Sequence, residues 1–269
     1  SRGRRVGSPE GSSASQQMPT VAAAAPPCEE SIAAIAAAAQ QLEDSDRSLC
    51  TQATALLTQV APGAKVSLAR CVAGRMVYVV DGAVGSAELH RAYDVVNNSG
   101  YKRVGFARPD TKDVRHAVCH YNPNEFRETP LYSTVQRLMG ALFPERLPQH
   151  LSRVYCNAKL FGDVGLVHRD TDSEGSTTVI LYPNLDWGPE LYGETFFYYP
   201  DKSPAFVVAP VPGRLCLFDA FILHSGSAPS RFLFGYRFTL ALKFRPDDGE
   251  HSSEDGDEMD GGPEDPVSQ

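Results

Sequence analysis

The chain has 269 residues, of which 42% are hydrophobic, and a formal net charge of -8. Ten of its 33 acidic residues lie between Pro246 and Gln269, where there is no lysine or arginine, so the rest of the chain is close to neutral. A chain of this length can bury the core of one domain of about 200 residues, which is large enough for an enzyme. The near-neutral body gives no support for nucleic acid as a partner.

The six cysteines are scattered and form no C-x-x-C pair, which is typical of reduced thiols in an intracellular protein. No apolar run approaches the roughly 20 residues that a membrane helix needs, and the start of the chain lacks the apolar region of a signal peptide. We therefore expect a soluble protein of the cytoplasm or nucleus with no membrane partner. The sequence does not indicate its oligomeric state.

Residues 1–27 are rich in arginine, serine and alanine and contain a single acid. This composition favours a disordered leader, and an organelle transit peptide is the alternative with the same composition. The alanine-rich segment Glu29–Val60 that follows predicts one amphipathic helix or two, because apolar residues recur at helical spacing. These residues are Leu49, Ala53, Leu56 and Val60.

The pattern changes at Lys65–Asp81, where β-branched and aromatic residues broken by an Ala-Gly pair predict two strands. A helix follows, for which we expect Ser86 to be the cap and Asn98-Ser99-Gly100 the stop signal. Another helix is predicted over Pro130–Phe143, with proline near its start and leucines at helical spacing.

Seven short β-rich runs separated by turn signals fill the rest of the chain up to Phe244, which predicts an antiparallel sandwich or barrel. They are SRVYCNAKLF, GLVHRD, STTVILYP, ETFFYYP, AFVVAPV, GRLCLFDA and GYRFTLALKF. The expected architecture is α+β, with the N-terminal helices packed on one sheet of the sandwich. Residues 246–269 lack aromatic residues and should form a disordered acidic tail.

One of these runs carries a histidine and an aspartate, His168 and Asp170, separated by one residue. On a strand or at its end, both side chains lie on one face while Arg169 points away. Such a pair alone more often reflects polar pairing on a surface, and a metal site needs a third ligand. His224, which follows the run GRLCLFDA, supplies it. Two histidines and one carboxylate that leave other positions open form the facial triad of non-haem Fe(II) oxygenases.

An ordered series of motifs between Arg153 and Phe244 resembles the 2-oxoglutarate-dependent Fe(II) dioxygenases, and most of all their prolyl 4-hydroxylase-like branch. The series is His168-Arg169-Asp170, Thr177–Tyr182, Gly193-Glu194-Thr195, Pro212–Asp219, His224-Ser225-Gly226 and Tyr236–Thr239. The resemblance implies a double-stranded β-helix, or jelly roll, as the core. It divides the chain into a leader (1–27), a helical segment (28–63), a dioxygenase domain (64–245) and the acidic tail (246–269).

The resemblance also implies roles for single residues. His168, Asp170 and His224 match the catalytic iron ligands. Arg237 matches the arginine that holds the far carboxylate of 2-oxoglutarate, which a planar guanidinium can bind through two hydrogen bonds. Thr239 shares the strand face of Arg237.

Three further residues are candidates for the pocket of the cosubstrate: Tyr182, Tyr155 and Asn157. A structural role is an equally good interpretation of each residue. The tyrosines would then be core aromatics whose hydroxyl groups are hydrogen-bonded. The implied cofactors are Fe(II), 2-oxoglutarate and O2, with ascorbate as an additional candidate. Arg231 is the competitor of Arg237, but the run around it, SAPSRFLFG, indicates a loop.

Several other polar residues have alternative interpretations. His116 and His120 lie in a run that indicates a strand or loop, and we expect structural or substrate-side roles for them. His90 should be exposed on its helix, and Asp219 should be a turn residue rather than a ligand. Trp187 is either a packing residue or part of the pocket rim.

Three features bear on the comparison with the family. Related halogenases carry a small residue in place of the carboxylate, so Asp170 favours hydroxylation. Arg237 follows His224 by thirteen positions, which is longer than in several relatives and implies a longer loop over residues 225–235. The common Gly-Gly-Glu-Thr element is Tyr192-Gly193-Glu194-Thr195 here.

The expected reaction is hydroxylation of an unactivated C–H bond with release of succinate and CO2. The first choice of substrate is a prolyl or other amino-acid residue of a protein or peptide. A free amino acid or natural product is second and a modified nucleobase third. The alternatives from other classes are a non-catalytic jelly-roll binding module and a hydrolytic zinc site, although zinc hydrolysis does not need the arginine-bearing strand.

Overall fold

The computed structural model describes residues 29–106, 115–172 and 174–247. The expected disordered leader and all but two residues of the expected acidic tail therefore lie outside the described residues. The chain divides into two compact units, residues 1–42 and 43–269, and the division falls inside the first helix, α1 (Glu29–Val60). Among the described helices, none is long and apolar enough to cross a membrane. The second unit holds everything that follows.

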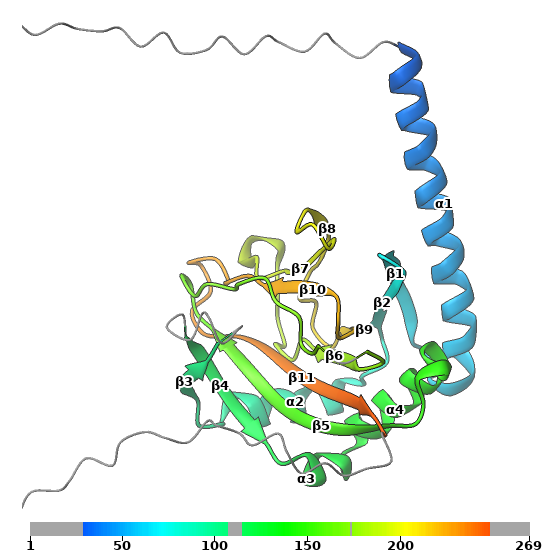
Figure 1. The fold of residues 1–269 in the computed structure, drawn as a ribbon. Helices are drawn as coiled ribbons and strands as arrows, with labels where there is room; N and C mark the ends of the chain where they lie inside the picture. The colour runs from blue at the N-terminus through cyan, green and yellow to red at the C-terminus, as the bar shows by residue number, and fades with distance from the viewer. Residues whose placement is uncertain (1–28, 107–114, 173, 248–269) are drawn as a thin grey trace, which may run out of the picture. The chain divides into compact units, whose positions relative to one another are not determined.

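Two antiparallel sheets form the body of the second unit (Figure 1). The large sheet has the order β1 (Lys65–Val72), β2 (Arg75–Asp81), β9 (Leu215–Asp219), β6 (Thr177–Leu181), β11 (Arg237–Pro246), β5 (Gln149–Lys159), β4 (His116–Tyr121) and β3 (Lys102–Gly105). The small sheet has the order β10 (Leu223–Gly226), β7 (Thr195–Tyr198) and β8 (Pro204–Val208).

The chain passes back and forth between the two sheets after β5. A short segment around His168 pairs with β10 of the small sheet, β6 returns to the large sheet, β7 and β8 lie in the small sheet, and β9, β10 and β11 alternate again. This alternation is that of a double-stranded β-helix. The predicted α+β fold with a jelly-roll core is therefore confirmed.

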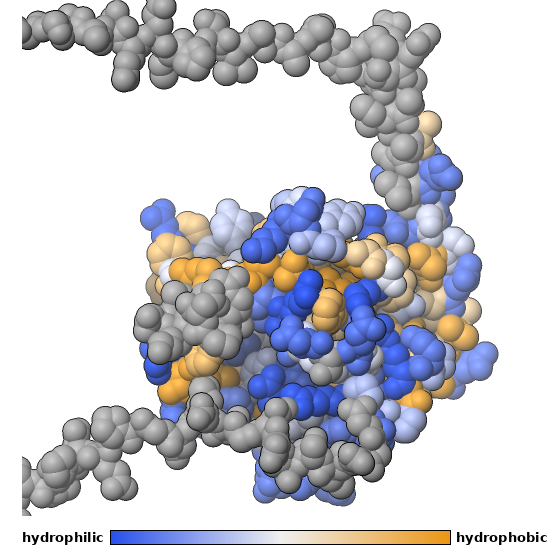
Figure 2. Space-filling view, viewed as in Figure 1, coloured by the Kyte–Doolittle hydropathy of each residue, from blue (hydrophilic) through white to orange (hydrophobic). Residues whose placement is uncertain are grey.

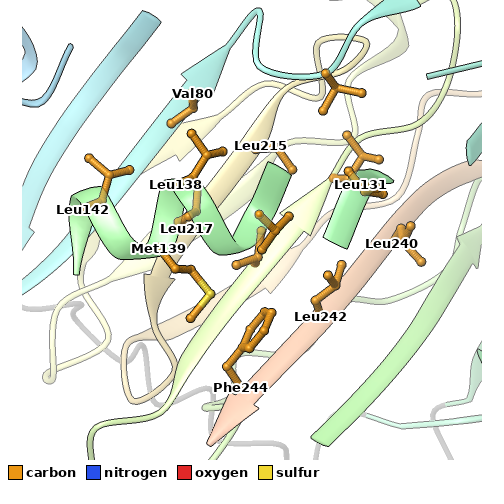
Figure 3. Close-up of a cluster of buried hydrophobic side chains, with 14 of the residues drawn as sticks. Val80, Leu131, Leu138, Met139, Leu142, Leu215, Leu217, Leu240, Leu242 and Phe244 are labelled. Atoms are coloured by element: carbon orange, nitrogen blue, oxygen red, sulfur yellow. The ribbon is translucent and has the colours of Figure 1, made fainter. Parts of the chain in front are cut away.

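Strand residues of the large sheet alternate between two apolar clusters, as the twofold period of a strand requires. Leu240, Leu242 and Phe244 of β11 point toward the helices, where they meet Leu138 and Met139 of α4 (Pro130–Leu142) (Figure 3). The second cluster lies between the sheets and includes Ile180, Tyr182, Phe197, Cys216 and Phe218. The same side of β11 carries Arg237, Thr239 and Lys243, so polar groups enter the space between the sheets.

The remaining helices are α2 (Ser86–Asn97) and α3 (Pro123–Arg127). The expectation that Ser86 caps α2 is wrong: Gly85, in an extended conformation, is the N-cap, and Ser86 is the first helical residue. Helix α4 begins as expected, with Pro130 in its first turn and the hydroxyl of Thr129 accepting a hydrogen bond from the Tyr132 N–H (3.2 Å). Such an acceptor satisfies one of the free N–H groups of the first turn.

The surface mixes polar and apolar residues. Figure 2 shows hydrophobic and hydrophilic residues side by side on the face in view. Large apolar side chains that are exposed include Phe161, Phe232 and Phe234. Scattered exposed apolar residues are normal in folded proteins. The five cysteines in the described part of the chain are free thiols.

The core between α4 and the large sheet should dominate stability. We expect Leu138→Ala to lower the free energy of unfolding by about 2–5 kcal/mol, because Leu138 is fully buried and its truncation leaves a cavity. Leu56→Ala is the matched control, since Leu56 is 53% exposed, and it should change stability by less than about 0.5 kcal/mol. Urea unfolding followed by circular dichroism measures both, and equal losses would contradict the assignment of this core.

Candidate metal centre

A pair of backbone hydrogen bonds places His168 beside His224. The N–H of His168 donates to the carbonyl of His224 (3.0 Å), and the N–H of His224 donates to the carbonyl of His168 (2.9 Å). The N–H of Asp170 donates to the carbonyl of Ala220 (3.0 Å). The run GLVHRD thus forms an isolated bridge to the small sheet rather than a full strand. His224, expected after a strand, lies within β10 itself.

Gly165 allows this close approach of the two chain segments. A Cβ atom at this position would lie 1.8 Å from the carbonyl oxygen of Gly226 and 2.8 Å from the ammonium nitrogen of Lys159. No side chain other than hydrogen fits there, which is the usual reason for glycine where two backbones meet.

The backbone arrangement brings together the three predicted ligands. One ligand atom from each of His168, Asp170 and His224 lies within 4.8 Å of the others. The His168 Nε2 is 3.6 Å from the Asp170 Oδ1, and the His224 Nε2 is 3.4 Å from the Asp170 Oδ2. The side chains of Asp170 and His224 are almost fully buried, while that of His168 is partly exposed. The group therefore has one side open to solvent.

Both imidazoles are oriented by their second nitrogen. The Nδ1 of His168 lies 2.9 Å from the carbonyl oxygen of Leu166, and the Nδ1 of His224 lies 2.9 Å from that of Ile222. A carbonyl oxygen can only accept, so each Nδ1 carries the hydrogen and each Nε2 presents a lone pair to the centre. Burial lowers the pKa of His224 to about 4, which keeps this ring neutral. Neutral imidazoles held in this way are the form that binds metal ions.

The carboxylate of Asp170 is bound from the large sheet. The hydroxyl of Thr178 donates to its Oδ2 (2.7 Å), and the ammonium group of Lys243 contacts the same oxygen. Burial alone would raise the pKa of Asp170, but Lys243, His224 and His168 together hold it well below the ordinary value. Asp170 is therefore ionised. Lys243 was missed by the sequence analysis, although a lysine at the inward-facing spacing of β11 was a usable signal.

The donor set fits a divalent transition metal. Two imidazole nitrogens and one carboxylate oxygen suit iron and its neighbours. Three protein ligands also leave coordination positions open, as in catalytic rather than structural metal sites. No other group of three histidine, cysteine or acidic side chains with this proximity is found in the part of the chain that the structure describes.

Arg237 is completely buried between the sheets. Its Nε donates to the carbonyl of Gly193 (2.5 Å), its Nη1 to the hydroxyl of Thr239 (3.3 Å) and its Nη2 to the hydroxyl of Thr195 (3.2 Å). No carboxylate among the described residues forms an ion pair with it. A buried charge without a counter-ion is costly, so this guanidinium has the properties of an anion-binding group.

The guanidinium lies close to the triad. A Cβ atom on Gly226 would be 3.3 Å from the Arg237 Nη1, and Gly226 is two residues beyond His224 on β10. Two residues of strand span about 7 Å. The predicted partners Thr239 and Tyr182 belong to the same cluster, since the Tyr182 hydroxyl donates to that of Thr195 (2.8 Å).

A second cation, Lys159, was also missed by the sequence analysis. It pairs with Arg237 in the register of β5 and β11, is 6% exposed, and donates to the carbonyl of Gly226 (2.6 Å). Burial and the charge of Arg237 lower its pKa to about 7. The alternation of Tyr155, Asn157 and Lys159 along β5 was the signal, because all three share one face.

Tyr155 and Asn157 contact different parts of the site. The Tyr155 ring is 5.5 Å from the ammonium group of Lys243, near the triad. The Asn157 Oδ1 is 3.0 Å from the Nε2 of His116. Neither residue hydrogen-bonds to Arg237. His116 lies on β4 and is half-buried, so the strand alternative for its run is the correct one.

Of the remaining predicted residues, Trp187 lies beside Gly193 and Arg237, since a Cβ atom on Gly193 would be 3.1 Å from the Trp187 Cζ2 and 3.0 Å from the Arg237 Cδ. Arg231 and His90 are exposed. Trp187 donates to the carbonyl of Tyr192 (2.9 Å). Asp219 follows the turn expectation by accepting from the Phe221 N–H (2.8 Å).

Asp219 is also a buried anchor that was not expected. Its carboxylate accepts from Arg75 (2.9 Å) and Arg146 (2.7 Å), so it joins the end of β9 to the start of β2 and to the short helix Pro144–Arg146.

Comparison with known proteins gives only distant likenesses. No protein-family model matches the chain, and no curated protein matches it. A 2OG-Fe(II) oxygenase-family oxidoreductase from Burkholderia pseudomallei has 14% identity and a TM-score of 0.49, covering 72% of this chain and 89% of that one. A prolyl hydroxylase from Trichoplax adhaerens, solved with a hypoxia inducible factor peptide, has 15% identity and a TM-score of 0.48, covering 77% and 93%.

A third solved structure, a prolyl-4-hydroxylase from Pseudomonas putida, has 18% identity and a TM-score of 0.42. The match covers 60% of this chain and 83% of that one. These identities and scores do not assign the chain to a family.

The half-buried His116 and the buried His224 predict a pH dependence of stability for the metal-free protein. Burial lowers the pKa of His116 and of His224 from 6.5 to about 4. Between these values the unfolded chain binds protons that the folded chain does not, so stability should fall as the pH drops from 6.5 to 4. His116→Gln should reduce the slope by about half. Urea unfolding of chelator-treated protein measures it, and an unchanged slope in this variant would contradict the assignment to His116.

Proposed function

We propose that the chain is an Fe(II)- and 2-oxoglutarate-dependent dioxygenase that hydroxylates an unactivated C–H bond and releases succinate and CO2. The observation that carries this proposal is the combination of an open three-ligand site with a buried arginine that has no acidic partner in the described chain. The Arg237 Nη1 lies beside Gly226, where a Cβ atom would be 3.3 Å from it, and Gly226 is two residues beyond His224 on β10. A dicarboxylate that also ligates the metal suits this arrangement.

His168, Asp170 and His224 would hold the iron through two Nε2 atoms and one carboxylate oxygen. Bound Fe(II), together with 2-oxoglutarate and O2, supplies the oxidising power that a protein side chain lacks. The protein contributes ligand orientation through the carbonyls of Leu166 and Ile222. Loss of such supporting hydrogen bonds typically weakens metal binding.

Arg237 would bind the far carboxylate of 2-oxoglutarate. Its planar guanidinium is already oriented by Gly193, Thr239 and Thr195, so little side-chain freedom is lost when an anion binds. Lys159, whose ammonium group donates to the carbonyl of Gly226, adds a second basic group next to this residue. A carboxylate placed here relieves the repulsion between these two cations.

Aromatic rings exclude water from the inner side of the triad. The ring centroid of His224 lies 4.9 Å from that of Phe218 and 6.1 Å from that of Phe197. Both phenylalanines are fully buried. A dry surface on this side leaves the partly exposed side of His168 as the route by which a substrate approaches.

The competing functions explain less of the site. A hydrolytic zinc site needs three ligands and a water but has no use for a buried arginine at this distance. A non-catalytic binding module has no chemical reason to keep the triad and Arg237 together. Both alternatives leave the unpaired guanidinium without a role.

A prolyl residue of a protein or peptide is the first choice of substrate, and it rests on the order of the sequence motifs alone. The cheapest test is succinate release by the iron-loaded protein with proline-containing peptides and with free L-proline in parallel. Faster release with peptides supports this choice, and faster release with the free amino acid favours the small-molecule alternative.

Iron and cosubstrate binding should be visible by spectroscopy. Anaerobic addition of Fe(II) and 2-oxoglutarate to the purified protein should produce the visible metal-to-ligand charge-transfer band. The band should be absent in Asp170→Ala, which removes one ligand. A wild-type protein without the band would overturn the cosubstrate assignment.

The role of Arg237 can be separated from that of the metal. We expect Arg237→Met to weaken 2-oxoglutarate binding by about 100-fold or more, because a buried charge pair is lost, with Fe(II) affinity little changed. Arg231→Met is the matched control, since Arg231 is exposed, and it should leave both affinities unchanged. Titration of the charge-transfer band measures them, and a larger effect of Arg231→Met would reverse the assignment.

A further inference from the structure

The two oxygens of the Asp170 carboxylate have different surroundings. Its Oδ2 accepts from the Thr178 hydroxyl and contacts the ammonium group of Lys243. Its Oδ1 has the Nε2 of His168 at 3.6 Å, and the same Oδ2 also has the Nε2 of His224 at 3.4 Å. One carboxylate therefore faces both the proposed metal position and a lysine.

Lys243 is buried and is committed to this carboxylate. Its side chain is 8% exposed, and Asp170 is the one acidic group in ion-pair contact with it in the described chain. Its other polar contact is the hydroxyl of Thr178 (3.2 Å). The ring of Tyr155 lies 5.5 Å from its nitrogen and covers it on another side.

The charges of the site explain why a lysine is present. Asp170 is almost fully buried, and the Nδ1–H of each histidine that faces it is directed to a backbone carbonyl rather than to the carboxylate. Without a cation, its negative charge would be left unpaired in the interior at a large cost in stability. Lys243 supplies the missing positive charge.

A metal dication at the triad would share this carboxylate with the ammonium group. The metal ion and the ammonium group of Lys243 would then be separated only by the width of one carboxylate group. Like charges at such a distance in the protein interior repel strongly. Metal binding therefore acts against the ion pair that stabilises the metal-free protein.

We infer that Lys243 is a built-in counter-ion of Asp170 with which a divalent metal competes for the carboxylate. This inference rests on the proposed metal site and adds a residue that sets the strength of metal binding. Lys243 is a positioning residue rather than a ligand. Its presence makes the metal-free chain more stable and the metal easier to release.

The test uses Co(II) as the probe and the full chain after treatment with a chelator. Titration followed by the visible absorption of bound Co(II) gives the dissociation constant. Lys243→Met should bind Co(II) about tenfold tighter than the wild type, because the repulsive charge is gone. Lys243→Arg retains the charge and should remain near the wild-type value.

Thermal unfolding gives a second measurement that does not depend on activity. The metal-free Lys243→Met protein should unfold at a lower temperature than the wild type, since Asp170 loses its counter-ion. Addition of Co(II) should then raise its unfolding temperature by more than it raises that of the wild type, because tighter binding stabilises more.

Two further variants act as controls. Arg153→Met removes the charge of Arg153, which is paired with Lys243 in the register of β5 and β11. Because Arg153 is exposed, Co(II) affinity should not change. Lys243→Gln keeps a hydrogen-bond donor and removes the charge, and it should bind Co(II) tighter even if Lys243→Met fails to fold.

The outcomes separate the inference from the proposed function. Unchanged or weaker Co(II) binding by the neutral variants overturns the competition, while Co(II) binding by the wild type that is lost in Asp170→Ala leaves the metal site standing. A wild-type protein that binds no Co(II) overturns both.

Discussion

The carboxylate of Asp170 is the point on which the site depends, because it joins the two sheets. Its backbone belongs to the segment that pairs with the small sheet through His168, and its N–H donates to the carbonyl of Ala220, which lies between β9 and β10. Its side chain is held by Thr178 and Lys243 from the large sheet. A buried carboxylate tolerates such a position only with hydrogen bonds and a counter-ion. The same contacts keep both of its oxygens in defined places, which is what a metal ligand requires.

Charge is distributed unevenly between the sheets. Three buried cations, Arg237, Lys159 and Lys243, face the interior, and Asp170 is the carboxylate in ion-pair contact with one of them among the described residues. One end of the site thus has a lysine matched to an acid, and the other has two cations without one. An anionic ligand that reaches from the unpaired cations to the triad would balance the second end. The proposed cosubstrate, 2-oxoglutarate, is a dicarboxylate and therefore an anion of this kind.

Much of the site could be predicted because its chemistry leaves marks along the chain. The H-x-D pair, a later histidine and an arginine on a strand are local patterns, and periodicity places Thr239 on the same face as Arg237. The same periodicity places Lys159 and Lys243 at inward-facing positions, but a lysine on a strand is ordinarily solvent-exposed, so the pattern alone did not single them out. Only the packing of the second sheet over them shows that they are buried. The error at Ser86 has a local cause, since Gly85 could also take the extended conformation that starts a helix.

The sequence by itself determined most of the strands, their turn signals, the α+β class and the residue types able to bind a metal, since these depend on periodicity and side-chain chemistry over short stretches. The tertiary structure decided which of them meet. His168 and His224 are 56 positions apart, and two backbone hydrogen bonds bring them together. The pairing of neighbouring strands decides three further features. It buries Arg237 rather than Arg231, places Tyr155 near Lys243, and brings Lys243 into contact with Asp170. That choice follows from the burial of apolar faces distant in sequence, and no short stretch of the chain contains it.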